Sequence, residues 1–172
     1  VLKRDGVCYS KEEYVRKKYK ESAKVFINAY GWFVKEAQHI VPKPEGAEYP
    51  YWAFTDLYNV DQTGDGHVLT LDVPIGEAIL FDMFDWTKIM QMHYIGENES
   101  EEATFSEELK NMGMNEFQIM TSNFYPEQKA RIQESWKRLF GHQQAIEAGD
   151  NSGVHSVQAG LWCIKDEWIV KE

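Results

Sequence analysis

The stretch that decides the fold is LTLDVPIGEAILFDMFDW, residues 69–86. Its first part alternates apolar and polar side chains with the period of a strand, and Pro74 interrupts the alternation. The continuous apolar run Ala78–Phe81 then predicts a buried strand. Asp85 follows at a position suited to a helix N-cap, and Trp86 begins the apolar face of that helix. This strand–helix unit indicates a fold that mixes strands and helices.

A long helix is predicted near the start of the chain. Ser10 and Glu13 have the spacing of a capping box. Apolar residues then recur at steps of three and four from Val15 to Ile40, and Pro42 ends the pattern. We therefore expect one continuous N-terminal helix that buries one face and exposes its lysines to solvent.

Strands and helices of unequal length alternate along the rest of the chain. Tyr49–Phe54 and Val157–Ile164 have the composition of strands, while Pro126 opens a helix whose apolar stripe includes Trp136. The prediction is one globular α+β domain, residues 1–172, with one long N-terminal helix and further helices packed on a mixed or antiparallel sheet.

The segment DQTGDG, residues 61–66, resembles the start of a calcium-binding loop. Such a loop needs a helix on each side and a glutamate at its twelfth position, whereas this chain has Asp72 there and Pro74 shortly after it. We interpret Gly64 and Gly66 as turn residues. The five histidines are not spaced as zinc ligands, so no metal site is predicted.

The composition is acidic, with a net charge of −10. Eight of the 18 basic residues lie in residues 1–24, so the rest of the chain is more acidic still. Such a chain repels nucleic acid, and it has no apolar run long enough to span a membrane. Two widely separated cysteines suit a reducing compartment. We expect a cytoplasmic protein that contacts no nucleic acid directly and whose acidic surface suits a basic protein partner.

Four residues are candidates for a ligand-binding site: Trp52, Asp82, Trp86 and Gln158. The tryptophans suit stacking on a base or nicotinamide ring, and they equally suit the core. Asp82 and Asp85 are three positions apart, a spacing that suits acid–base work or, for Asp85, helix capping. Gln158 is expected to be buried in its strand, where the amide needs a partner or a ligand. No catalytic residue is assigned, and whether the chain is an enzyme stays open.

Four segments resemble the bacterial domain-of-unknown-function 3841 family. They are YPYWAF at 49–54, LTLDVPIGEAILFDMFDW at 69–86, QESWKRLF at 133–140 and VQAGLWCIKDEWIVK at 157–171. Members of that family open with a strand of the type Leu-Trp-Thr-x-Gln ahead of a segment that Leu2–Gly6 resembles. The resemblance therefore implies a first strand N-terminal to Val1, which this sequence lacks.

The segment VQAGLW, residues 157–162, is also similar to the Gln-Ala-Glu strand of ADP-ribosyltransferases of the DNA-targeting toxin type. In those enzymes the glutamate supports departure of nicotinamide from NAD, and here Gly160 stands in its place. The resemblance implies a degenerate transferase-like fold, or one whose acid comes from elsewhere, with an NAD-like nucleotide as the candidate ligand.

Two functions follow from the sequence. The first is a small-ligand or nucleotide-binding module without a tightly bound cofactor. The second is an acidic interaction or inhibitor protein from a mobile element that engages a basic, nucleic-acid-binding partner.

Overall fold

A computed structural model describes residues 1–63 and 66–170, except for the side chains of three residues in the first helical region: Ser22, Lys24 and Val25. The helices are α1 (Leu2–Asp5), α2 (Glu12–Tyr19), α3 (Ala23–Ala37), α4 (Met83–Met90), α5 (Glu99–Asn111), α6 (Glu116–Thr121), α7 (Pro126–Ser135) and α8 (Gln143–Glu147). The strands are β1 (Val7–Cys8), β2 (Tyr51–Phe54), β3 (Ala78–Asp82), β4 (Val157–Leu161) and β5 (Ile164–Lys165). The α+β class predicted from the sequence is confirmed.

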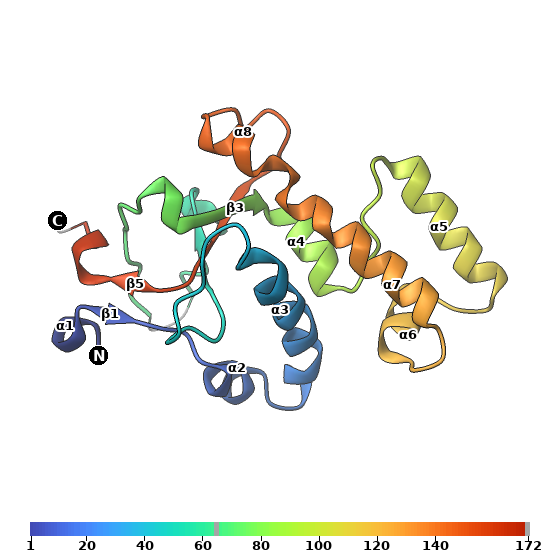
Figure 1. Ribbon diagram of the computed structural model, residues 1–172, viewed down its shortest axis with the longest axis horizontal. Coiled ribbons are helices and arrows are strands. Elements are labelled where there is room, and N and C mark those ends of the chain that lie inside the picture. The colour runs from blue at the N-terminus through green and yellow to red at the C-terminus, as the bar shows by residue number, and fades with distance from the viewer. Residues whose placement is uncertain (64–65, 171–172) are drawn as a thin grey trace.

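The central sheet is antiparallel. Its strand order is β2-β4-β3, with Leu161 of β4 opposite Tyr51 on one side and Ala78 on the other. β1 and β5 pair in a separate two-stranded sheet, which brings the two ends of the chain together (Figure 1). Both strand regions predicted from aromatic and apolar runs, β2 and β4, are confirmed with shorter bounds.

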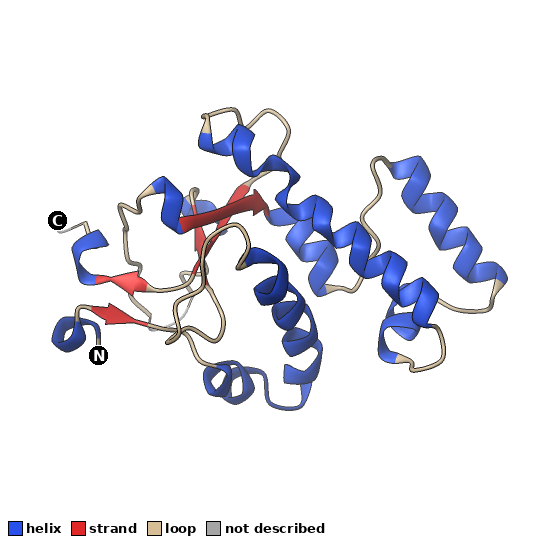
Figure 2. Ribbon diagram, viewed as in Figure 1, coloured by secondary structure: helices blue, strands red, loops and turns tan. Residues whose placement is uncertain are grey.

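The main core lies between one face of the central sheet and α3, α4 and the 3-10 helix η4 (Trp136–His142). Phe33 of α3, Phe81 of β3 and Trp136 are fully buried there. The opposite face carries a smaller cluster under Ile146 of α8. Figure 2 shows α5, α6 and α7 as a helical half beside this sheet half. Among the residues described, no helix combines the length and apolar character needed to cross a membrane.

The prediction of one long N-terminal helix is wrong. The chain turns at Lys20, which has a φ of 48°, and a short 3-10 turn separates α2 from α3. α2 then lies back against α3, so that the ring of Tyr19 stacks on Phe26 with centroids 3.8 Å apart. A continuous apolar stripe can be buried along one straight helix or between two helices that face each other. This chain takes the second arrangement.

Two local predictions are also corrected. Residues 67–74 form no regular strand, because only Leu71 finds a partner, in an isolated bridge to Ile169. Ser10 does not cap a helix; it forms an isolated bridge, and Lys11 is the N-cap of α2. The turn expected at Gly64 lies outside the described residues.

Candidate functional site

Asp82 ends β3 and is the N-cap of α4. Its carboxylate accepts hydrogen bonds from the backbone amides of Phe84 (3.0 Å), His155 (3.1 Å) and Ser156 (3.3 Å). The residue is only 3% exposed, and aspartate is seldom buried so deeply unless it is paired. The predicted capping role of Asp85 is therefore wrong, because Asp82 takes that position.

The imidazole of His155 completes the set of partners. Its Nδ1 lies 2.8 Å from Oδ2 of Asp82. An ionised carboxylate can only accept, so Nδ1 donates the hydrogen and Nε2 of the neutral ring keeps a free lone pair. The side chain of His155 is 74% exposed. The buried carboxylate thus fixes the orientation of a ring whose outer nitrogen is open to solvent.

One exposed aromatic side chain, that of Phe84, lies beside this pair. The ring of Phe84 is 4.9 Å from that of His155, and Phe84 is 51% exposed. Asn59, in the turn after β2, donates from Nδ2 to Oγ of Ser156 at 2.8 Å. That contact brings the turn, with its exposed Tyr58, to the same end of the sheet. An aromatic face next to a fixed hydrogen-bond acceptor suits a planar ligand.

The two aspartates at the start of α4 have opposite pKa shifts. Burial raises the pKa of Asp82, but hydrogen bonds from His155 and from backbone amides outweigh burial and hold the pKa below its ordinary value. Burial, with the nearby charge of Asp82, raises the pKa of Asp85. These shifts keep the Asp82 carboxylate ionised and favour the protonated form of Asp85 more than in an exposed aspartate.

Trp52 and Trp86, both predicted as ligand-binding residues, pack against each other with ring centroids 4.6 Å apart. Nε1 of Trp52 donates to the hydroxyl of Tyr30 at 3.0 Å, and Phe33 packs against both indoles. The structure therefore places both tryptophans in the main core, which was one of the two interpretations. A ligand could stack between them only if this core opened.

Gln158 is buried in β4, as predicted, between Phe54 and Phe81 of the neighbouring strands. Its Oε1 has no hydrogen-bond partner among the described residues. An unsatisfied buried acceptor costs about 1–3 kcal/mol. Gln158 pairs with Phe81, so this unsatisfied amide faces the main core.

Gly160 faces the main core. A Cβ at this position would lie 3.0 Å from Cζ of Phe33. The glycine lets the phenylalanine ring lie directly on the sheet, and a larger side chain there would overlap the ring. Packing alone explains Gly160, so the similarity to a transferase strand gains no support from this position.

His155 was missed by the sequence analysis. It lies in a polar loop 73 positions after Asp82, and no spacing rule connects the two. The available signal was Asp82 itself, a carboxylate at the end of an apolar strand, where a buried charge must find partners.

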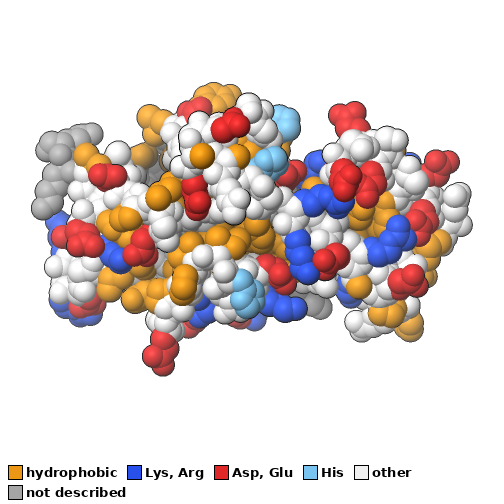
Figure 3. Space-filling view, turned by 45° about the horizontal axis from the view of Figure 1, so that its top comes forward, with side chains coloured by type: hydrophobic (Ala, Val, Ile, Leu, Met, Phe, Trp, Pro, Cys, Tyr) orange, Lys and Arg blue, Asp and Glu red, His pale blue; other side chains and the backbone are white. Residues whose placement is uncertain are grey.

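Charged side chains do not gather into one acidic face on the side drawn in Figure 3. Acidic and basic groups are interspersed over the helical half, and hydrophobic groups lie across the centre. Within the part of the chain that the structure describes, no group of three or more His, Cys, Asp and Glu side chains is arranged to hold a metal ion. The face drawn in Figure 3 therefore gives the interaction-protein alternative no support.

These features define an α+β domain in which a buried carboxylate holds an exposed imidazole at the end of a three-stranded antiparallel sheet. The chain belongs to the family described as Domain of unknown function (DUF3841), whose sequence profile matches residues 1–170. No curated protein and no solved structure matches the chain. The family resemblance seen in the sequence is confirmed, and the function has to be argued from the site.

Proposed function

We propose that this chain binds a small planar ligand, such as a nucleobase or the nicotinamide ring of a nucleotide, where Asp82 holds His155. The observation that carries the proposal is a carboxylate 3% exposed beneath an imidazole whose side chain is 74% exposed. Burying a carboxylate costs free energy of folding. In this structure the buried carboxylate holds an exposed imidazole in a fixed orientation.

The chemistry of recognition follows from the geometry. Nε2 of His155 accepts a hydrogen bond from an N–H or O–H group at the edge of the ligand ring. The exposed face of Phe84 lies alongside and supplies stacking area.

The test is calorimetric titration of the chain with adenosine, nicotinamide and NAD. The wild-type chain is compared with His155→Ala and with His67→Ala, a matched control because both histidines are exposed. We expect at least one ligand to bind with a Kd below about 1 mM, which corresponds to about 4 kcal/mol. His155→Ala should weaken that binding about tenfold, as expected for the loss of one hydrogen bond of about 1.4 kcal/mol.

His67→Ala should bind as the wild type does. Equal binding by wild type and His155→Ala, or no binding of any of the three ligands, would overturn the proposal.

A further inference from the structure

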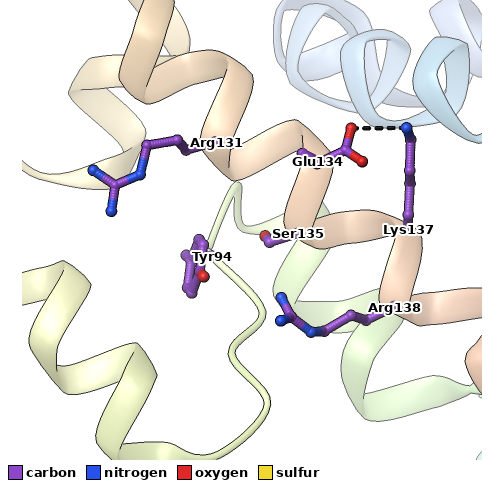
Figure 4. Close-up of a pocket in the computed structure, with 6 residues that line it drawn as sticks. All are labelled: Tyr94, Arg131, Glu134, Ser135, Lys137 and Arg138. Carbon is purple, nitrogen blue, oxygen red and sulfur yellow. Dashed lines mark ion pairs between the residues drawn. The ribbon is translucent and has the colours of Figure 1, made fainter.

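An open pocket of about 540 Å³ lies in the helical half, away from the Asp82–His155 pair. Its volume is within the range of about 300–1,000 Å³ that small-molecule sites occupy. The loop after α4 and the helix formed by α7 and η4 supply its lining: Tyr94, Arg131, Glu134, Ser135, Lys137 and Arg138 (Figure 4).

The lining holds three cationic side chains and one acidic one, and its arginines also pair with Glu97, Glu101 and Glu108 beside the pocket. Arg131 lies on α7 and Arg138 on η4, and both line the pocket. Figure 4 shows Tyr94 between them. Lys137 also lines the pocket, where it pairs with Glu134 at 2.7 Å.

Both guanidinium groups are held in place by neighbouring acceptors. Arg131 donates to both carboxylate oxygens of Glu108, at 2.5 and 3.1 Å. Arg138 donates to the carbonyl of Ile95 at 3.0 Å and to Glu97 at 3.2 Å. The side chains remain 44% and 36% exposed, and each guanidinium has five N–H groups. Exposed ion pairs contribute little to stability, so a stronger anion can share or displace these carboxylates.

We propose that this pocket binds a small phosphate-bearing molecule through Arg131 and Arg138. A guanidinium matches phosphate with two parallel hydrogen bonds, and two such groups around one tyrosine suit a ligand with more than one phosphoryl group. The site is separate from the planar-ligand site: Tyr94 follows the C-terminal end of α4, whereas Asp82 caps its N-terminal end.

The test is calorimetric titration with inorganic pyrophosphate. Wild type, Arg131→Gln and Arg138→Gln are compared with Arg16→Gln, a matched control because Arg16 also forms an exposed pair with a glutamate, on α2. Each pocket variant should weaken binding about tenfold or more, since each loses a charge-assisted contact to phosphate. Arg16→Gln should change the affinity less than about twofold, because it lies outside the pocket. Thermal unfolding confirms that the variants are folded.

If pyrophosphate at a concentration of about 10 mM does not bind, the proposal is overturned, because typical ligands bind at far lower concentrations. An equal loss in Arg16→Gln would also overturn it, because it would indicate a non-specific charge effect. Citrate tests the phosphate assignment, and citrate binding as tight as pyrophosphate binding would refute it. Adenosine and nicotinamide carry no phosphate, so failure of both to bind counts against the planar-ligand site alone.

Discussion

The two halves of the molecule treat charge in opposite ways. In the sheet half, the buried Asp82 has its acceptor positions filled by backbone amides and His155. In the helical half, charged groups stay at the surface and pair with each other, as Arg131 does with Glu108. A buried charge is tolerated only in one well-satisfied geometry, whereas exposed pairs are weak and exchangeable. The sheet half is therefore suited to hold one side chain in a fixed orientation, and the helical half offers donors that a ligand can recruit.

The largest effect is expected where the two halves meet. Trp136 is fully buried, its ring packs on Trp32, and its Nε1 donates to the carbonyl of His93 at 2.6 Å. Trp136→Ala should lower the free energy of unfolding by about 3–5 kcal/mol, because it leaves a large cavity and an unpaired carbonyl. Urea denaturation measures the change. A loss below about 1 kcal/mol would mean that the halves do not depend on this contact.

Tight packing of the sheet half is tested at Gly160. Gly160→Ala should lower the free energy of unfolding by about 1–3 kcal/mol, because the new methyl group would overlap the ring of Phe33. Gly31 is the matched control: it lies exposed within α3, with nothing within 4 Å of an added Cβ. Gly31→Ala should stabilise the chain by about 0.5–1 kcal/mol. Denaturation that showed the same sign for both variants would contradict this view of the core.

Asp82→Asn tests the buried charge while keeping a side chain that can cap α4. We expect the free energy of unfolding to fall by about 1–3 kcal/mol at pH 7. The amide has only one acceptor oxygen, so its NH2 group would face backbone N–H donors. The lowered pKa of Asp82 means that its contribution is present above the unfolded value of about 3.9 and is lost as the pH falls through the lower folded value.

Stability curves against pH check this expectation, and Asp85→Asn provides the contrast. The raised pKa of Asp85 means that its carboxylate destabilises the fold once the pH rises through that value, so Asp85→Asn should be at least as stable as wild type at pH 7. A wild-type curve that is flat below pH 5, about one unit above the unfolded pKa, would contradict the assignment for Asp82.

The smallest effect on stability is expected in the helical half. Arg131→Gln should change the free energy of unfolding by less than about 1 kcal/mol, because its pair with Glu108 is exposed. Chemical denaturation at low and high salt provides the measurement. A loss of more than about 2 kcal/mol would show that this half also depends on fixed charges, and the comparison of the two halves would fail.

Local chemistry predicted some elements whose signals lie within a few residues, but it failed for the capping box at Ser10 and for the alternation over residues 67–74. The apolar runs predicted β3 and β4, and Pro126 at the start of α7 predicted that helix. The turn at Lys20 was not predictable in the same way, because the apolar stripe is identical whether the helix continues or folds back. The stacking of Tyr19 on Phe26, a tertiary contact, stabilises the folded-back arrangement.

The candidate site also combines features that the local sequence predicted with features that depend on tertiary contacts. Alternation along the strand predicted burial of Gln158, but only the folded chain shows that its Oε1 lacks a partner. Asp82 was a candidate from its position, while His155 reaches it through the antiparallel pairing of β3 with β4. Contacts that depend on chain topology leave no short-range pattern in the sequence.

Amide chemical-shift mapping with adenosine tests the central claim most directly. Adenosine has a planar base and no phosphate, so it separates the site at Asp82 and His155 from the arginine pocket. We predict that shifts concentrate in residues 82–84 and 153–158 and that His155→Ala removes them. Shifts confined to α5–α7, or shifts unchanged by His155→Ala, would contradict the account.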